Sequence, residues 1–416
     1  MSSHLRDSFK LYNTYSQAKE PFSPVDPQSN LARIYVCGIT PYDTSHMGHA
    51  LTALTFDTIH RYLEFLGYQV KHVQNLTDID DDIIKRAKRD GVPYDQLGQS
   101  WDKIYRDSLK AINCLPFDSY VPASTKVPEI VQLVQGLVER GVAYKAADNN
   151  VYFRAASFKN YSGLSHLNED EILEKARAAA EDSLVDSPEN QAKESVMDFI
   201  IWQAARPNEP SWPSPYGEGR PGWHIECSAI GLDQFGPQFE IHGGGADLIF
   251  PHHSSEIAQS ETYTGKHPLV KYWMHVGMVH LGTEKMSKSL GNLVLVRDVL
   301  KNYSPDALRI YLLSIQYRAP LYYEESGVAE AETQVSRFKA ALEAEGTKSG
   351  PLLAVESYQT NFFTAMNDDL NTPDALATAL TLADTISQST ATHNLSEAQA
   401  SLRQMLGLFG LFLAQV

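Results

Sequence analysis

A strand, a helix and a second strand follow one another near the N-terminus, and this order limits the folds open to the chain more than any other segment. Residues 33–39 (RIYVCGI) form an apolar, β-branched run that is typical of a buried strand. Residues 47–66 repeat apolar side chains at mostly helical spacing, and Gly67 ends that pattern. A second strand is predicted at 68–74. Strands joined by a crossover helix run parallel, so we expect an α/β fold on a parallel sheet.

The middle of the chain is less regular. Residues 95–145 have a mostly helical pattern, whereas 146–200 are mixed and polar, with an acidic segment at 168–194. We therefore interpret 146–200 as an insertion or mobile loop more than as core. Residues 206–222 contain five prolines and three glycines, which predicts a long irregular loop. Ordered loops of that length are often functional.

The C-terminal part changes in composition. Beyond about residue 325, Ala, Leu, Glu and Gln recur at helical spacing, and Thr372 followed by a proline fits a helix start with Thr as the N-cap. We expect a main domain over 1–325, with an insertion at approximately 115–200. A helical bundle is expected over 326–416.

Composition narrows the class of protein. The chain has 416 residues, a net charge of −16 and three cysteines. The negative charge disfavours broad, nonspecific nucleic-acid binding, but it is compatible with an RNA partner held by a local basic groove. Three cysteines make no disulfide framework, the N-terminus lacks a signal-peptide core, and the apolar tail at 406–414 is too short to span a bilayer. We expect a soluble cytoplasmic protein without a membrane partner.

Residues 40–49 (TPYDTSHMGH) lie between the first strand and its helix. This is the carboxyl edge of a parallel sheet, where open α/β folds bind nucleotides, and a helix N-terminus there favours phosphate. His46 and His49 face the same side, and Gly48 lets a ligand approach the backbone. The alternative is an ordinary helix start with two surface histidines.

A second candidate segment is 285–289 (KMSKS), which precedes Gly291. Lys285 and Lys288, with two serines, make a cationic loop that can neutralise a leaving pyrophosphate as charge develops in the transition state. The alternative is a solvated basic turn.

Four dispersed side chains form a candidate metal site. Cys37 ends the first strand, Cys227 lies far downstream, and His252 and Glu256 are i,i+4 neighbours if that segment is helical, with His253 pointing elsewhere. Two thiolates, an imidazole and a carboxylate are a plausible zinc set. The alternative is two buried free thiols beside surface histidines.

Trp223 precedes Cys227 by one helical turn, so both would face one pocket. An aromatic wall beside a thiophilic metal suits a small sulfur-bearing ligand. The alternative is a core tryptophan that closes the Pro/Gly-rich loop.

The HxGH turn and the KMSKS loop together are the paired signatures of class I aminoacyl-tRNA synthetases, although the first reads HMGH here instead of the commoner HIGH. Over essentially its whole length the chain resembles the cysteinyl-tRNA synthetase family. The segments that carry this resemblance are LYNT, YVCGIT, HMGHA, NLTDIDDDII, EPSWPSPYGEGRPGWHIECSAI, FEIHGGGADLIFPHH, EIAQSE, EKMSKSLGN, DALR and DDLNTPDA.

The resemblance implies a Rossmann-like class I catalytic domain over 1–325 with an insertion, followed by a DALR-type α-helical bundle over 326–416. It implies one Zn²⁺ per chain, with ligands Cys37, Cys227, His252 and Glu256. The implied catalytic residues are His46, His49, Lys285 and Lys288. The implied ATP-binding residues are Thr40, His46, Gly48, His49 and Lys288. The implied substrate-binding residues are Thr40, near the substrate carboxylate, and Trp223.

The implied activity is ATP-dependent activation of L-cysteine, with Mg²⁺ bound to ATP, and transfer to tRNA(Cys). We expect a monomer. Two departures suggest an alternative: the chain ends at Val416, where an anticodon-binding extension would follow, and Ala50-Leu51 replace the usual arginine after HIGH. Both traits resemble a sister enzyme of mycothiol biosynthesis, which joins cysteine to the amine of glucosaminyl-inositol.

Other traits favour the tRNA ligase. These are Glu256 as the fourth ligand, Ile241-His242 before three glycines, and the absence of an ERGGDP segment, since 176–190 reads ARAAAEDSLVDSPEN. A third hypothesis is a non-catalytic paralogue that binds cysteine or ATP. It predicts eroded motifs, whereas every metal and phosphate position is retained.

Overall fold

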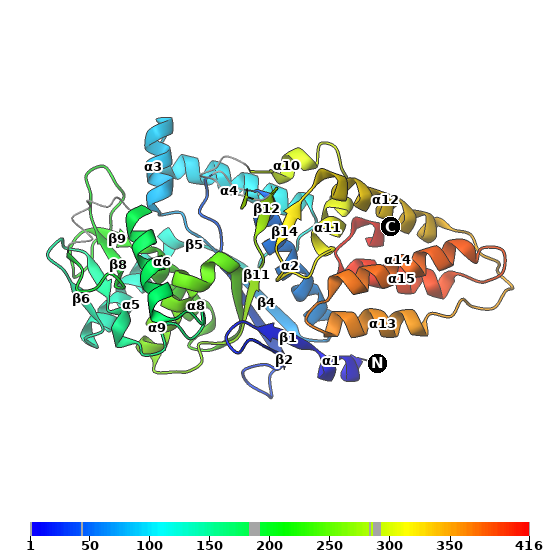
Figure 1. Cartoon of the computed structure of the whole chain (residues 1–416), viewed down its shortest axis with the longest axis horizontal. Coiled ribbons are helices and arrows are strands. Elements are labelled where there is room, and N and C mark those ends of the chain that lie inside the picture. The colour runs from blue at the N-terminus through cyan, green and yellow to red at the C-terminus, as the bar shows by residue number, and fades with distance from the viewer. Residues whose placement is uncertain (1, 43–44, 183–191, 283, 286–292, 416) are drawn as a thin grey trace.

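The computed structural model describes the chain except for residues 1, 43–44, 183–191, 283, 286–292 and 416. A central sheet stands between a smaller β-containing lobe on one side and a helical bundle on the other (Figure 1). Among the described helices, none combines the length and the apolar character that crossing a bilayer requires.

The central sheet is parallel throughout, with strand order β11-β10-β3-β4-β5. Its strands are β3 (Leu31–Val36), β4 (Gln69–Leu76), β5 (Ser119–Pro122), β10 (Phe239–Gly245) and β11 (Val270–Val276). Helix α2 (Met47–Phe65) connects β3 to β4, which confirms the predicted strand–helix–strand unit. Ile34, Leu54, Ile59 and Ile241 are buried together in the core beneath it.

The expectation of a mostly helical 95–145 is confirmed, although the short strand β5 separates its two long helices. That stretch holds α4 (Tyr94–Ala111) and α5 (Val127–Glu139), but β5 lies between them and pairs with β4. The strand has only four residues, SYVP. An alternating pattern of apolar and polar residues cannot be recognised over so short a stretch between two helices.

The lobe on the other side of β5 is an antiparallel sheet with order β6-β7-β8-β9. Its strands are β6 (Ala143–Lys145), β7 (Val151–Phe153), β8 (Phe199–Ala204) and β9 (Gly219–Pro221), and α6 (Glu169–Asp182) lies between β7 and β8. Residues 151–153 are fully buried. Val151 and Phe153 pack with Ile130 and Leu137 of α5 in a second core. The interpretation of 146–200 as more loop than core is therefore wrong at β7, where three apolar residues decide the packing.

The remaining elements flank the central sheet. The N-terminal ones are α1 (Ser2–Ser8), β1 (Lys10–Asn13) and β2 (Ala18–Pro21). Those around the carboxyl edge are α3 (Asp81–Asp90), α8 (Trp223–Phe235) and α9 (Ser254–Thr264). Those leading to the bundle are β12 (Val279–Leu281), β13 (Glu284–Lys285), α10 (Val296–Val299), α11 (Pro305–Leu313) and β14 (Leu321–Tyr323).

The bundle comprises α12 (Glu325–Glu343), α13 (Glu356–Asn367), α14 (Thr372–Gln388) and α15 (Ser396–Leu408). The predicted helix start is displaced by one residue: Asn371 is the N-cap of α14 and accepts from the Asp374 amide. The Thr372 hydroxyl instead donates to the Leu313 carbonyl at 2.7 Å. The bundle packs directly on α2, where the Tyr62 hydroxyl donates to Asn367 Oδ1 at 2.6 Å.

His72 of β4 is expected to make the fold sensitive to acid. Burial, with a smaller effect of His60, lowers the pKa of His72 to about 3. Below the ordinary pKa of about 6.5 the unfolded chain takes up this proton and the folded chain does not, so stability falls as the pH falls. We expect His72 to account for about 2 kcal/mol of the stability lost between about pH 7 and pH 5. Urea unfolding of His72→Gln and the parent at both values measures this; equal losses would contradict it.

Candidate functional site

The predicted nucleotide segment forms the N-terminus of α2. His46 is the N-cap, and its Nδ1 accepts from the Gly48 amide at 3.1 Å. The His46 and His49 rings stack with centroids 3.7 Å apart. The structure thus brings both histidines together at the carboxyl edge of β3, at the N-terminus of α2, where the helix dipole favours negative charge. Such an arrangement is suited to phosphate.

The loop between β3 and α2 is clamped to the neighbouring strand β4. The Gly38 amide donates to Asn75 Oδ1 at 2.7 Å. A Cβ at Gly38 would lie 1.6 Å from the Asn75 carbonyl oxygen, so the approach requires glycine. Thr40 follows, half-buried, and its carbonyl accepts from the Tyr42 amide at 2.8 Å. The loop therefore places Thr40 between the strand end that carries Cys37 and the histidines of α2.

The KMSKS segment begins at the end of the hairpin formed by β12 and β13. Lys285 pairs with His280 through the backbone, whereas Lys288, with the rest of 286–292, lies outside the described residues. The chain that follows returns to the HMGH segment: the Met47 amide donates to the Val294 carbonyl at 3.0 Å, and the Val296 amide donates to the Ser45 carbonyl at 2.9 Å. The segment that follows the KMSKS loop therefore meets the HMGH segment at one edge of the sheet.

The four predicted metal ligands also converge. Cys37, Cys227, His252 and Glu256 are all buried, and their ligand atoms lie within 4.8 Å of one another. The Cys37 and Cys227 Sγ atoms are 3.8 Å apart, and His252 Nε2 is 3.1 Å from Glu256 Oε1. They come from the ends of β3, α8, the turn at 249–253 and α9. The arrangement can hold a metal ion.

At three members of this cluster the interactions of the side chains outweigh burial, whereas burial raises the pKa of the Cys37 thiol well above its ordinary value. Burial raises the pKa of the Glu256 carboxyl, but the His242 and His252 imidazoles lower it to about 2. Burial lowers the pKa of His252, but Cys227 and Glu256 raise it to about 10. Burial likewise opposes the Cys227 thiolate, yet Cys37 and His252 lower the pKa of that thiol to about 6. Without metal, the Cys227 thiolate and the Glu256 carboxylate thus lie beside a protonated His252. A metal cation can take the place of that proton.

His253 does not point elsewhere, as the sequence suggested. Its Nε2 lies 3.2 Å from Cys37 Sγ, and its Nδ1 lies 2.7 Å from His275 Nε2. His275 in turn contacts the Thr14 hydroxyl at 2.8 Å, which gives the N-terminal LYNT segment a place in the site. The helix that carries Glu256 begins at Ser254, and His253, which immediately precedes it with helical φ and ψ, is the i,i+3 neighbour of Glu256 and faces the cluster.

Two further histidines orient the ligands, and sequence reasoning gave them no such role. His242 Nε2 lies 3.0 Å from Glu256 Oε2, and its Nδ1 lies 2.8 Å from the Tyr35 carbonyl. His224 Nδ1 lies 3.0 Å from His252 Nδ1. Partners of this kind fix the ring orientation of a metal ligand. Their signal was in the quoted segments WHIEC and FEIHGGG, but spacing alone could not show which way each ring points.

Trp223 starts α8 and lies over the cluster. Its ring is 4.4 Å from that of His252, and 42% of the residue is exposed. The open side faces a pocket of about 210 Å³, between α3 and β9. Residues that line it with Trp223 include Asp80, Asp81, Gln203 and Arg220. The structure thus places an aromatic surface beside both the metal-ligand set and a polar hollow.

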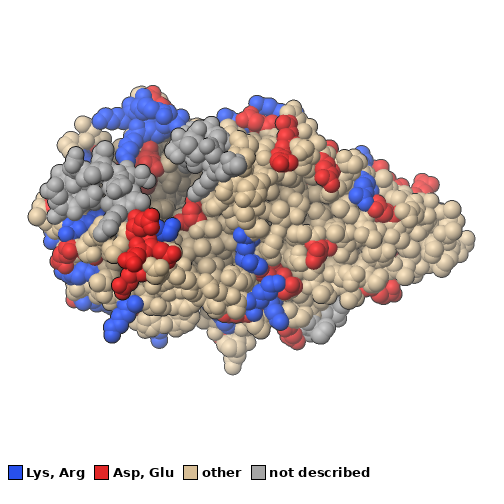
Figure 2. Space-filling view, viewed as in Figure 1, with Lys and Arg blue, Asp and Glu red and all other residues tan. Residues whose placement is uncertain are grey.

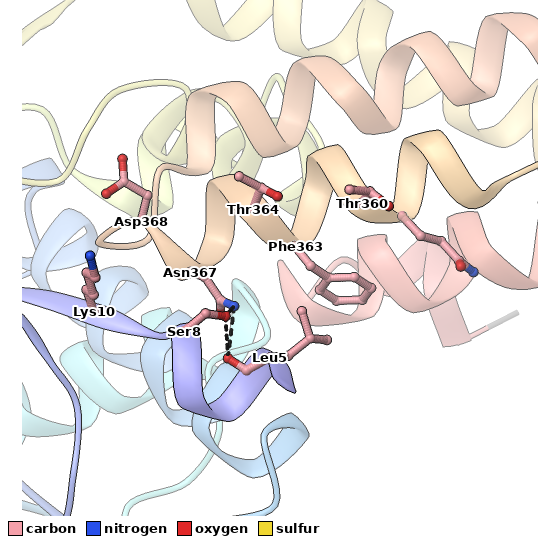
Figure 3. Close-up of a pocket in the computed structure, with 9 residues that line it drawn as sticks. Leu5, Ser8, Lys10, Thr360, Phe363, Thr364, Asn367 and Asp368 are labelled. Carbon is pink, nitrogen blue, oxygen red and sulfur yellow. Dashed lines mark hydrogen bonds between the residues drawn. The ribbon is translucent and has the colours of Figure 1, made fainter. Parts of the chain in front are cut away.

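Another hollow, of about 450 Å³, lies between α1 and α13 (Figure 3). The described residues that line it belong to neither the cysteine–histidine cluster nor the HMGH segment. They are Leu5, Ser8, Lys10, Gln359, Thr360, Phe363, Thr364, Asn367 and Asp368. We assign it no part in the site.

Solved structures with a similar fold place the chain in a class. Over 92% of this chain and 90% of the other, it superposes on Mycobacterium tuberculosis methionyl-tRNA synthetase in complex with methionyl-adenylate, with a TM-score of 0.63 and 15% identity. A leucyl-tRNA synthetase from Agrobacterium radiobacter, solved in a ternary complex with tRNA, gives 0.63 over 94% of this chain and 85% of the other, at 13% identity. The fold, with its paired signature segments, is that of a class I aminoacyl-tRNA synthetase.

Sequence comparison narrows the class to one family. The model described as the tRNA synthetases class I (C) catalytic domain matches residues 23–333, and the DALR domain model matches 361–414. A cysteine–tRNA ligase of Dehalococcoides mccartyi is 43% identical over 97% of this chain and 86% of its own length. One from Cronobacter sakazakii is 43% identical over 97% and 85%. The chain belongs to the cysteinyl-tRNA synthetase family.

Proposed function

We propose that this chain activates L-cysteine with ATP and transfers it to tRNA(Cys), and that a zinc ion at the cysteine–histidine cluster recognises the substrate thiol. Membership of the family supports the cysteine–tRNA ligase activity. The observation that carries the mode of recognition is the convergence of Cys37, Cys227, His252 and Glu256 beside the HMGH turn. We also propose a monomeric, cytoplasmic enzyme, in keeping with three cysteines that are all free thiols.

The geometry of the cluster fits zinc. Two thiolates bound at about 2.3 Å to a tetrahedral ion lie about 3.8 Å apart, and the Cys37 and Cys227 sulfurs are separated by 3.8 Å. A zinc ion held there would supply a soft Lewis acid for which the substrate thiolate is a far better ligand than a hydroxyl. Serine, which differs from cysteine in that one atom, would then be rejected without an editing site.

Other residues of the chain would bind cysteine and ATP and stabilise the transition state of adenylate formation. Trp223 would line the cysteine pocket, and Thr40 would lie near the substrate carboxylate, which attacks the α-phosphorus of ATP. His46 and His49 would hold the phosphates against the amides at the start of α2. Lys285 and Lys288, with Mg²⁺ brought by ATP, would stabilise the pentavalent transition state and the leaving pyrophosphate.

A local basic surface supports tRNA as the acceptor on an otherwise acidic chain. Lysine and arginine gather over α3 in Figure 2, and Lys85, Lys88 and Arg89 there are exposed. The other end of α3 lines the pocket beside Trp223 through Asp81. Phosphates of a nucleic acid could thus be held next to the site of transfer. An amine acceptor would need no such surface, and we keep it as the alternative outcome of the test.

The experiment has two stages. In the first, cysteine-dependent exchange between ATP and labelled pyrophosphate is measured together with zinc content by mass spectrometry. We expect one zinc per chain, and exchange with cysteine at least about 100-fold faster than with serine. In the second, tRNA(Cys) or glucosaminyl-inositol is added to the preformed adenylate. Consumption by tRNA alone supports the proposal, consumption by the amino sugar alone identifies the alternative, and absence of exchange overturns both.

A further inference from the structure

A buried arginine in the DALR element joins helices from both halves of the molecule. Arg309 of α11 is fully buried, and its Nη2 donates to Asp57 Oδ2 of α2 at 2.5 Å. Its Nε donates to the Phe409 carbonyl at 2.7 Å, and its Nη1 donates to the Ile112 carbonyl at 2.6 Å. One guanidinium thus uses all three of its nitrogens on partners from three other parts of the chain.

Two of these partners stand at helix C-termini. Ile112 is the C-cap of α4, and Phe409 is the C-cap of α15. The last carbonyls of a helix are short of intrahelical partners and carry partial negative charge, so a cation stabilises both ends at once. Arg309 therefore sits where α4 of the catalytic half and α15 of the bundle both end against α2.

Asp57, the acceptor on α2, has two further hydrogen-bond donors. Asp57 also accepts from Arg61 Nε at 2.9 Å and from the Leu115 amide at 2.7 Å. Burial raises the pKa of the Asp57 carboxyl, but Arg309 and Arg61 outweigh it and lower the pKa. A buried carboxylate with this many partners has one well-defined position, because losing any of them leaves a charge unpaired in the interior.

A second set of hydrogen bonds links α2 near Asp57 to the turn after α15. Arg61 Nη2 donates to the Asn113 carbonyl, and Asn113 Nδ2 donates to the Gly410 carbonyl, each at 2.7 Å. Gly410 has φ +68°, and a Cβ there would lie 2.2 Å from Arg309 Nη2. The turn after α15 thus packs against the arginine so closely that only glycine fits.

Helix α2 carries this constraint to the nucleotide edge. It runs without a break from Met47 to Phe65, and Asp57 lies ten residues, or about 15 Å of helix, from its first residue. The N-terminus carries His46 and His49 and also anchors the strand that returns from the KMSKS segment. A shift of Asp57 along or around the helix axis would displace the histidines, since a packed helix moves as a unit.

We propose that Arg309 is a positioning residue for the nucleotide site: by tying Asp57 to the C-termini of α4 and α15, it sets where α2 presents His46 and His49. The inference rests on the proposed function, which places ATP at that end of α2. It makes the bundle a part of the catalytic apparatus, although the bundle contributes no residue to the site.

The test adds a methyl group at Gly410, where the C-terminal turn packs against Arg309. In Gly410→Ala every charge is kept, but the new methyl group must push Arg309. We expect KM for ATP in cysteine-dependent pyrophosphate exchange to rise about 10-fold, because misplacement by about 1 Å costs up to about 100-fold. KM for cysteine and zinc content should change less than about twofold, because the ligand cluster does not rest on α2.

Two alanine variants serve as matched controls. Gly407→Ala adds a methyl group one turn earlier in α15, where the nearest side-chain atom is 3.9 Å away. Gly91→Ala imposes the same φ, +68°, with nothing within 4 Å. Both should keep the parent KM for ATP. A merely structural Arg309 would give lower thermal stability in Gly410→Ala with an unchanged KM for ATP in the folded fraction, and that result would overturn the proposal.

Two further variants decide the question if Gly410→Ala does not fold. Asn113→Gly removes only the bond to Gly410 and suits the positive φ of 58° at that position. It should raise KM for ATP by about threefold. Arg309→Ala should lose exchange activity and recover part of it in millimolar guanidinium but not in urea, since guanidinium alone restores the charge and its donors. Failure of both effects would overturn the proposal, whereas an inactive parent enzyme would instead sink the proposed function.

Discussion

Cys227→Ala is expected to lose bound zinc and cysteine activation together. The side chain supplies one of the two sulfurs in a cluster of four ligands, and the remaining thiol, imidazole and carboxylate form a weaker set for a soft metal. Because loss of even an outer partner of a zinc ligand costs about 10–100-fold, we expect kcat/KM for cysteine to fall by more than about 100-fold. Zinc content by mass spectrometry and pyrophosphate exchange on the same preparation measure both effects.

Cys114→Ala is the matched control for this substitution. Cys114 is the remaining cysteine of the chain and is not one of the four candidate metal ligands. This variant should keep its zinc and its activity. If Cys227→Ala retained one zinc per chain and normal turnover with cysteine, the role assigned to the cluster would be wrong.

Lys288→Ala is expected to slow adenylate formation far more than it weakens cysteine binding. The resemblance assigns this lysine to the phosphates of ATP, where its charge is most useful as pyrophosphate leaves. Loss of one such preorganised group costs about 100- to 1,000-fold in kcat. Single-turnover formation of the adenylate in a quenched-flow instrument gives the rate, and the cysteine concentration dependence gives the binding constant.

Lys301→Ala provides the comparison, because it removes a lysine from the exposed surface soon after the same loop. Among the residues that the structure describes, Lys301 is paired only with Asp298, its near neighbour, and 70% of its side chain is exposed. It should leave both measurements unchanged. A normal single-turnover rate in Lys288→Ala would remove the KMSKS loop from the proposed mechanism.

Much of the site could be predicted because its candidate residues lie near the ends of strands and helices. The strand that ends at Cys37 and the helix that begins after His46 follow from apolar periodicity, and a parallel sheet gathers such ends at one edge. Two cysteines with a His and a Glu one helical turn apart are a plausible zinc set, and the resemblance to the cysteinyl-tRNA synthetase family favoured this set over buried free thiols. Their convergence in space is what the structure adds.

What could not be predicted depends on direction and on short segments. Strand β7 has three residues and β5 has four, so neither shows a period. His253 faces the cluster because it is the i,i+3 neighbour of Glu256, whereas the prediction considered only the i,i+4 pair of His252 with Glu256. The buried contact of Arg309 with Asp57 joins positions 252 residues apart. Nothing in either local sequence names the other residue as its partner.

The dispersion of the metal ligands also determines when the ion can be captured during synthesis. Cys37 leaves the ribosome 190 residues before Cys227, the other sulfur of the set. Until Cys227 has followed, the nascent chain offers only one sulfur of the set, and a lone thiol binds zinc weakly and is open to oxidation. A metal ion held by these four side chains would therefore be bound late, after β10 and α9 have docked onto strands made long before.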